Sequence, residues 1–289
     1  MRMTDKTTAA VVVMIAVLFS LSCEDSKMRA AKNSVRLSER LPDDSLRRLS
    51  QQTIYFGHQS VGYNILEGIR DILKEYPQQA LNIVKTREPA TSKAPFFAHS
   101  SIGRNGQPVS KLDDFSDVLR RHSPARVDVA LMKFCFVDFT EQTNVQDLFR
   151  RYTDTFMGLK DSFSGTTFVH VTVPLTGSPT GLKWVMRDVV KRLIGRHVGS
   201  YKDNRPINEF NDLIRNTYLG KEPVFDLAAI ESTHADGTRV MNQDAGRAVY
   251  SLAPEYNLDG GHLNETGRRI VALELLRFLA ALPEKAPLK

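Results

Sequence analysis

The sequence has few cysteines, and its apolar runs are short. Among its 289 residues there are only two cysteines, Cys23 and Cys135, and a single tryptophan. Two thiols cannot form a disulfide framework or a cysteine-based zinc site. Cys135 follows an apolar run, so we expect it to be a small buried residue of the folded domain and not a nucleophile.

Signals for metals, cofactors and nucleic acids are also missing. The seven histidines include no H-E-x-x-H pattern, so the sequence predicts neither a metal site nor a cofactor. The net charge is +6, but the basic residues are dispersed along helical segments and lack an aromatic platform. We therefore expect no nucleic-acid partner and interpret these residues as solvated helix faces.

The N-terminus is typical of an exported protein. Arg2 and Lys6 precede an apolar run over residues 9–21, which is the pattern of a secretory signal peptide. A permanent membrane span needs about 20 apolar residues, so this run is short for one, although an uncleaved anchor is the alternative. We expect residues 1–22 to be the signal, 23–48 a polar tether and 49–285 the folded domain.

The end of this leader reads Ser-Leu-Ser-Cys and resembles a bacterial lipoprotein signal. The resemblance implies that Cys23 is the lipidated first residue of the mature protein. We therefore expect a membrane-anchored lipoprotein of the cell envelope, periplasmic or on the cell surface. Ordinary signal cleavage close to Cys23 is the alternative.

Beyond the tether, short strand-like runs alternate with longer amphipathic helical patterns. This alternation predicts an α/β fold, a doubly wound and mostly parallel sheet of about five strands with helices on both faces. In such sheets ligands bind outside the carboxyl ends of the strands. The expected strands are 53–56, 81–85, 127–136, 167–173 and 223–227, and the expected helices 61–76, 108–121, 145–159, 182–194, 206–218 and 265–281.

Two polar clusters follow strands of this predicted sheet. Ser60 lies in Gly-His-Gln-Ser-Val-Gly, between the first strand and its helix, where free N–H groups favour developing negative charge. Taken alone, Ser60 is explained better as a helix cap. Asp259 lies three residues before His262, in a loop with two glycines, and can orient the imidazole so that its other nitrogen accepts a proton.

Together the two clusters resemble the SGNH (GDSL-type) hydrolases. The resemblance covers residues 53–279, and its most specific part is DGGHLNETG over residues 259–267. It implies a flavodoxin-like fold in which Ser60 is the nucleophile and Asp259 and His262 complete the triad.

The middle motifs of that family fit less closely. The resemblance implies an oxyanion donor on the loop 101–106, for which Gly106 is the first choice and Gly103 the second. The family's Gly-x-Asn-Asp motif has no Asn here, so Asn105 or Lys133 replaces that donor, or the site uses fewer donors. His58 stands where the family has Gly, and we expect it either to line the substrate pocket or to hydrogen-bond the turn.

The resemblance implies a serine esterase that hydrolyses short acyl esters, and together with the expected export it suggests O-acylated glycans as a natural substrate. Two alternatives stay open at this point. One is a polysaccharide O-acyltransferase that uses the same triad. The other is a non-catalytic envelope or glycan-binding lipoprotein on a hydrolase scaffold.

Overall fold

The computed structural model describes residues 39–79, 81–89, 94–121, 127–177 and 204–283. The predicted signal, Cys23 and the helix expected at 182–194 lie outside these residues, and so these three stay predictions. Within the described ranges, no helix combines the length and the apolar character that a membrane crossing requires.

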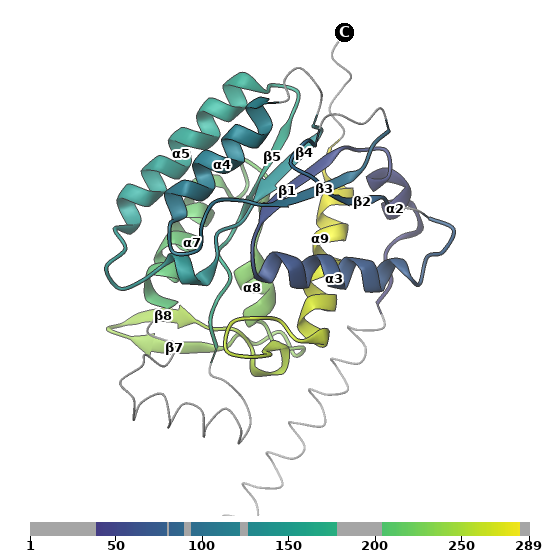
Figure 1. Cartoon of the computed structure of the whole chain (residues 1–289). Helices are drawn as coiled ribbons and strands as arrows, with labels where there is room; N and C mark the ends of the chain where they lie inside the picture. Colours follow the sequence, from purple (N-terminus) through teal and green to yellow (C-terminus); the bar gives the residue numbers. More distant parts are fainter. Residues whose placement is uncertain (1–38, 80, 90–93, 122–126, 178–203, 284–289) are drawn as a thin grey trace, which may run out of the picture.

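A parallel sheet forms the centre of the molecule (Figure 1). Its strand order is β2-β3-β1-β4-β5-β6, and every neighbouring pair is parallel. The predicted doubly wound α/β fold is therefore confirmed. The strands are β1 (Ile54–His58), β2 (Ile83–Lys85), β3 (Phe97–Ser101), β4 (Val129–Met132), β5 (Thr167–Val171) and β6 (Val224–Phe225).

The prediction of about five strands missed β3, which lies between β2 and β1. Its sequence, Phe-Ala-His-Ser-Ser, is too polar to suggest a buried strand, yet His99 and Ser100 are both buried. Their polar atoms have partners on β1. The hydroxyl groups of Tyr55 and Ser100 lie 2.7 Å apart, and the rings of His58 and His99 meet at 3.1 Å.

Helices cover both faces of the sheet. Helices α3 (Val61–Leu73) and α9 (Glu265–Ala281) pack together on one face, and α4 (Pro108–Arg121) and α5 (Val145–Ser162) lie on the other (Figure 1). Their apolar residues recur at helical spacing and are buried, as in α3, which turns Ile65, Ile69 and Ile72 inward. Helix α7 (Asn204–Tyr218) packs on α5, and the short α8 (Leu227–Ser232) on α9.

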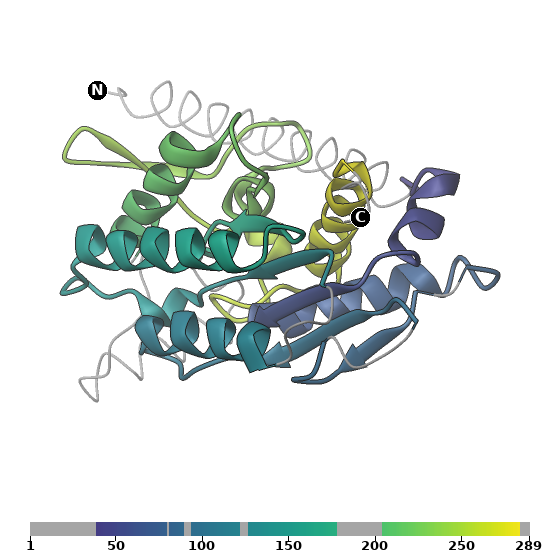
Figure 2. The ribbon, with the colours of Figure 1, turned by 90° about the horizontal axis from the view of Figure 1, so that it is seen from above.

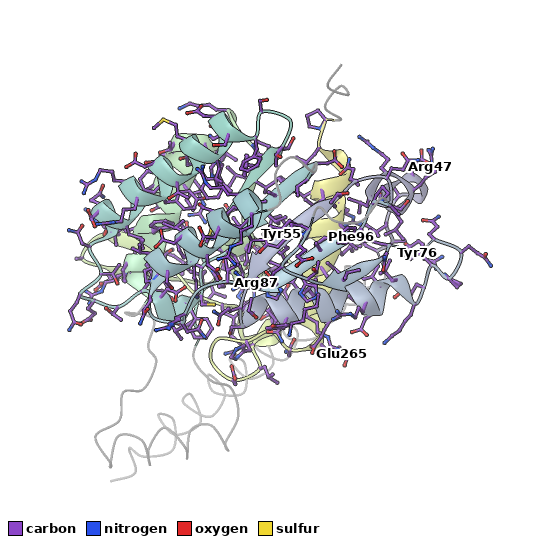
Figure 3. The ribbon with its side chains drawn as sticks, turned by 45° about the horizontal axis from the view of Figure 1, so that its top comes forward. Arg47, Tyr55, Tyr76, Arg87, Phe96 and Glu265 are labelled. Atoms are coloured by element: carbon purple, nitrogen blue, oxygen red, sulfur yellow. The ribbon has the colours of Figure 1, made fainter. Side chains whose placement is uncertain are left out.

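The folded part of the chain begins inside the segment expected to be a tether over residues 23–48. Helix α2 (Asp43–Leu49) packs on α9 and buries Leu46 and Leu49. The backbone N–H of Leu41 donates to the hydroxyl of Tyr76, which is labelled in Figure 3 together with Arg47 of α2. The predicted tether is too long at its C-terminal end because the many charged residues of α2 made this segment look polar throughout in the sequence.

A two-stranded hairpin, which the sequence pattern did not predict, lies at the opposite end of the molecule from α2 (Figure 2). It consists of β7 (Met241–Asp244) and β8 (Arg247–Tyr250). Both turn residues have positive φ, 48° at Ala245 and 78° at Gly246, as short hairpin turns require. Two short 3-10 helices, η1 (Phe136–Asp138) and η3 (Pro254–Tyr256), complete the described elements.

Candidate active site

Ser60 occupies the turn between β1 and α3, directly after a strand from the middle of the sheet. Its φ is 50° and its ψ −110°, a backbone conformation that costs a residue other than glycine about 1–3 kcal/mol. Its side chain does not cap α3, so the explanation of Ser60 as a helix cap fails. Such strain persists where the surrounding structure holds a side chain in a particular place.

The structure brings Asp259 and His262 to this serine across some two hundred positions of sequence. The Oγ of Ser60 lies 2.6 Å from the Nε2 of His262. On the other side of the imidazole, Nδ1 lies 2.8 Å from one carboxylate oxygen of Asp259 and 3.0 Å from the other. The loop ends where α9 begins, at the Glu265 labelled in Figure 3.

The electrostatics of this loop keep Asp259 ionised. Burial raises the pKa of its carboxyl, but hydrogen bonds from the backbone and side chain of His262 outweigh burial and hold that pKa below its usual value. An ionised Asp259 accepts the Nδ1–H of His262, which leaves Nε2 without a proton and able to accept one from Ser60. The side chains of His262 and Asp259 are 35% and 34% exposed, so the site is open to solvent.

Phe136 supports the histidine from the side. Its ring meets that of His262 edge-on, with 5.8 Å between centroids. A Cβ on Gly261 would lie only 2.4 Å from the Phe136 ring, so this position accepts no side chain without displacing that ring. The glycine beside the histidine is therefore required by close packing.

Gly106, the expected oxyanion donor, is not available for that role. Its N–H donates to Oδ1 of Asp138 at 2.8 Å, and the N–H of Gly103, the second choice, donates to Asp114 at the same distance. Both backbone N–H groups thus already donate hydrogen bonds within the fold, and their acceptors lie outside this loop in the sequence. The backbone N–H of Ser60, in contrast, has no hydrogen-bond partner among the described residues.

The two proposed replacements for the missing Asn differ in accessibility. Lys133 is fully buried, and its ammonium group donates to the carbonyl of Phe134, so it is not presented to a substrate. Asn105 is exposed on the loop between β3 and α4. Its Oδ1 accepts a hydrogen bond from Lys111, and its Nδ2 has no partner in the described part of the chain.

His58 was expected either to line the substrate pocket or to hydrogen-bond the turn, and the structure shows neither arrangement. Its side chain is completely buried and its Nε2 faces Nδ1 of His99. Burial, and then the nearby charge of Lys133, lowers the pKa of His58 to about 2, so the ring is neutral. A Cβ on Gly62 would lie 2.4 Å from this ring, so His58 supports the nucleophile turn from beneath.

Lys111 and Asp138 lie next to the candidate site, although the sequence does not indicate them as site residues. Both side chains are completely buried, and their charged groups lie 2.5 Å apart next to the loop that carries Asn105. No local pattern indicates the pair because the two residues stand on separate elements, α4 and η1.

Cys135 is buried and forms no disulfide within the described part of the chain, so it is the small buried residue that was expected.

No protein-family model matches this sequence, and none of the curated proteins matches it. Among solved structures, the chain is similar to a GDSL-like lipase from Bacteroides thetaiotaomicron, with 13% identity, a TM-score of 0.45, and coverage of 89% of this chain and 98% of that one. It is also similar to the periplasmic domain of a lipopolysaccharide acetyltransferase from Salmonella ser. Paratyphi A, with 9% identity, a TM-score of 0.43, and coverage of 80% and 87%. With so few identical residues, what these proteins act on says nothing about what this chain acts on.

Proposed function

We propose that this chain is a serine esterase of the SGNH type, in which Ser60 attacks an acyl ester and His262 and Asp259 serve as its base and orienting carboxylate. The observation that carries the proposal is the continuous line of contacts from Ser60 Oγ through the imidazole to Asp259, at 2.6 Å and 2.8 Å. Nucleophile and base within hydrogen-bonding reach, with the base oriented by a third group, are what nucleophilic catalysis requires.

The first half of the reaction acylates the serine. The oxygen of Ser60 bonds to the ester carbonyl carbon while its proton passes to Nε2 of His262, and the carbonyl electron pair moves onto oxygen. The free N–H of Ser60 can donate to that oxyanion. The intermediate then expels the alcohol, which takes the proton from His262, and the acyl group stays on Ser60.

The second half restores the enzyme. A water molecule gives a proton to Nε2 of His262 and attacks the acyl carbon. Collapse of this intermediate releases the carboxylic acid and returns the proton to Ser60. An O-acyltransferase would use a sugar hydroxyl at this step in place of water, so product analysis with and without a sugar acceptor separates the two activities.

Ester hydrolysis by the purified protein tests the proposal. The substrate is a short p-nitrophenyl ester and the variant is Ser60→Ala, with Ser162→Ala as a matched control because Ser162 is exposed on α5. We expect kcat/KM to fall by about 10³-fold or more in Ser60→Ala and to stay unchanged in the control. Equal rates for wild type and Ser60→Ala would refute the proposal.

Fluorophosphonate labelling asks separately whether the serine is activated. Peptide mapping should place the label on Ser60, and His262→Ala should abolish it. His234→Ala is the matched control, since His234 also pairs with a carboxylate, Glu255 at 2.7 Å, but contacts no serine there. A protein that takes up no label would favour the non-catalytic alternative.

We further propose, from the leader residues, that the enzyme is exported and anchored through a lipidated Cys23. From this location and the family resemblance, we propose O-acylated glycans as its substrates. Mass spectrometry of the mature N-terminus tests the lipid anchor, and an unmodified Cys23 would refute it. Release of acetate from an O-acetylated glycan tests the substrate.

A further inference from the structure

Helix α7 presents three buried asparagines to the backbone of other segments. Asn204, Asn208 and Asn211 follow one another at intervals of four and three residues, so they lie on one face of the helix. The three residues are 0%, 6% and 1% exposed. A buried amide must satisfy both its carbonyl and its NH₂ group within the protein. The partners of these side chains therefore show what this face of α7 holds in place.

Two of the asparagines hold the segment that follows β5, residues 173–177, which we call the strap. Oδ1 of Asn211 accepts the N–H of Val173 at 2.7 Å, and its Nδ2 donates to the carbonyl of the same residue at 2.9 Å. Asn204 holds Thr176 in the same way, at 2.8 Å from the N–H and 2.7 Å from the carbonyl. Each amide thus pairs with both backbone groups of one residue, as a neighbouring strand would.

Glu231 of α8 fixes the strap between these two points. This residue is buried, and its Oε1 accepts the backbone N–H of Leu175. Side chains from α7 and α8 therefore hold three of the five residues of the strap. A buried segment whose backbone is bonded in this way opens only at a cost in free energy, so the strap is a rigid support.

The strap in turn holds the loop of the triad. The N–H of Gly177, the last residue of the strap, donates to the carbonyl of Gly260 at 3.0 Å. Gly260 comes directly after Asp259, and its φ of 105° is one that few residues besides glycine adopt. A Cβ on Gly177 would lie 2.8 Å from the backbone oxygen of Leu252, so the close approach requires glycine at this position too. A displacement of the strap would therefore displace the backbone beside Asp259.

We propose that Asn204 and Asn211 are positioning residues of the triad. Through the strap they hold the carboxylate of Asp259 against the imidazole of His262. This inference rests on the proposed esterase function. The imidazole takes the proton of Ser60 during the reaction, and Asp259, 2.8 Å away, stabilises the positive charge that forms on it. A displacement of about 1 Å in such a site can lower the rate about 10²-fold.

Asn208 offers a matched control on the same helix. Its Oδ1 accepts the N–H of Tyr250 at 3.0 Å and its Nδ2 donates to the carbonyl of Tyr250 at 3.1 Å, so these bonds reach β8 and not the strap. Asn204→Ala and Asn208→Ala therefore remove the same kind of buried amide, and both should lower the midpoint of urea unfolding. We expect kcat for p-nitrophenyl acetate to fall about 10–100-fold in Asn204→Ala, with KM changed far less, and to stay unchanged in Asn208→Ala.

A double-mutant cycle in the full-length protein separates positioning from a general loss of stability. Asn204→Ala should lower kcat in the wild-type background but cause no further loss in Asp259→Asn, because it acts through that carboxylate. Equal losses in both backgrounds would overturn the proposal. If Asn204→Ala does not fold, Asn211→Ala, which releases the other end of the strap, is tested in the same cycle. Thr176→Val is the milder variant, since it removes only the bond of the Thr176 hydroxyl to Asn204 at 2.9 Å, and it should give a smaller loss of kcat.

Proton NMR gives a readout that does not depend on catalysis. The Nδ1–H of His262, shared with Asp259, should give a low-field proton resonance that is absent from His262→Ala. This resonance should shift or broaden in Asn204→Ala and stay in place in Asn208→Ala. An unchanged resonance in Asn204→Ala would contradict the proposal.

The outcomes separate this inference from the proposed function. If the wild-type protein shows no Ser60-dependent hydrolysis, the proposed function fails, and the resonance alone shows whether the strap holds the histidine–carboxylate pair. If hydrolysis depends on Ser60 while Asn204→Ala and Asn211→Ala keep the wild-type kcat, the esterase stands and only the positioning role is wrong.

Discussion

Three histidine–carboxylate pairs occur among the described residues, and two of them, one at His262 and one at His170, differ in what surrounds them. His262 lies 2.8 Å from Asp259, and His170 lies 3.0 Å from Glu222. The second nitrogen of His262 faces the hydroxyl of Ser60, and the side chain is 35% exposed. The second nitrogen of His170 faces the hydroxyl of Tyr152 at 2.8 Å, and the side chain is completely buried.

The surroundings of His170 leave no place for a substrate. The ring of Tyr218 stacks on it with 3.6 Å between centroids, and Lys160 pairs with Glu222. Burial lowers the pKa of His170 to about 4, although the hydrogen bond to Glu222 opposes that shift. The comparison shows that a histidine–carboxylate pair alone does not mark a catalytic site. Access to solvent and a strained serine beside the imidazole distinguish the candidate.

The largest difference between the two pairs should appear in kcat when each carboxylate is replaced by the corresponding amide. In Asp259→Asn the carboxamide cannot hold the Nδ1–H tautomer of His262, so kcat for a p-nitrophenyl ester should fall about 10⁴-fold. Glu222→Gln should leave kcat nearly unchanged. Its effect should appear in the free energy of unfolding, within about 1 kcal/mol, because Glu222 is partly exposed.

Steady-state kinetics and urea denaturation of both variants check this expectation. Circular dichroism at a single temperature controls for folding. A large loss of kcat in Glu222→Gln without loss of fold would mean that the buried pair also serves catalysis, and the distinction between the two pairs would be wrong.

A smaller effect, on stability, is expected when the buried histidine is removed. His170→Phe fills the site with an aromatic ring but leaves the hydroxyl of the buried Tyr152 without its partner. The free energy of unfolding should fall by about 1–3 kcal/mol, the usual cost of an unsatisfied buried polar group. At a temperature where the variant is folded, kcat should match the wild type. An unchanged unfolding midpoint in urea would contradict this interpretation of His170.

A contrast between local and distant contacts also explains what could be predicted from the sequence. The meeting of Ser60, Asp259 and His262 was predictable because each half carries a local signal, glycines around Ser60 and an Asp three residues before a His. The closing helix was predicted at its observed bounds, 265–281, because its apolar pattern lies within the helix itself. Features whose deciding residues lie within a few positions of each other can be predicted from the sequence alone.

Features that depend on distant partners were not predictable. Strand β3 was missed because its polar residues find their partners on β1, and Gly106 was misassigned because its N–H is taken by Asp138. The burial of His58 beneath its own turn depends on His99, which comes from another strand. In each case the deciding contact joins residues more than thirty positions apart or on different strands.

The smallest expected effect is a change in the pH dependence of stability. The folded protein keeps His170 neutral because its pKa is lowered from 6.5 to about 4, whereas the unfolded chain binds a proton there below pH 6.5. This contribution to stability is therefore complete above pH 6.5 and is lost as the pH falls toward 4, at up to about 1.4 kcal/mol per pH unit. His170→Phe should flatten the slope of unfolding free energy against pH in this range. The control is Phe168→Leu, which removes packing on the same strand but no titrating group. It should lower the unfolding free energy at every pH while keeping the slope against pH. Equal slopes in His170→Phe and wild type would show that His170 is not held neutral by burial.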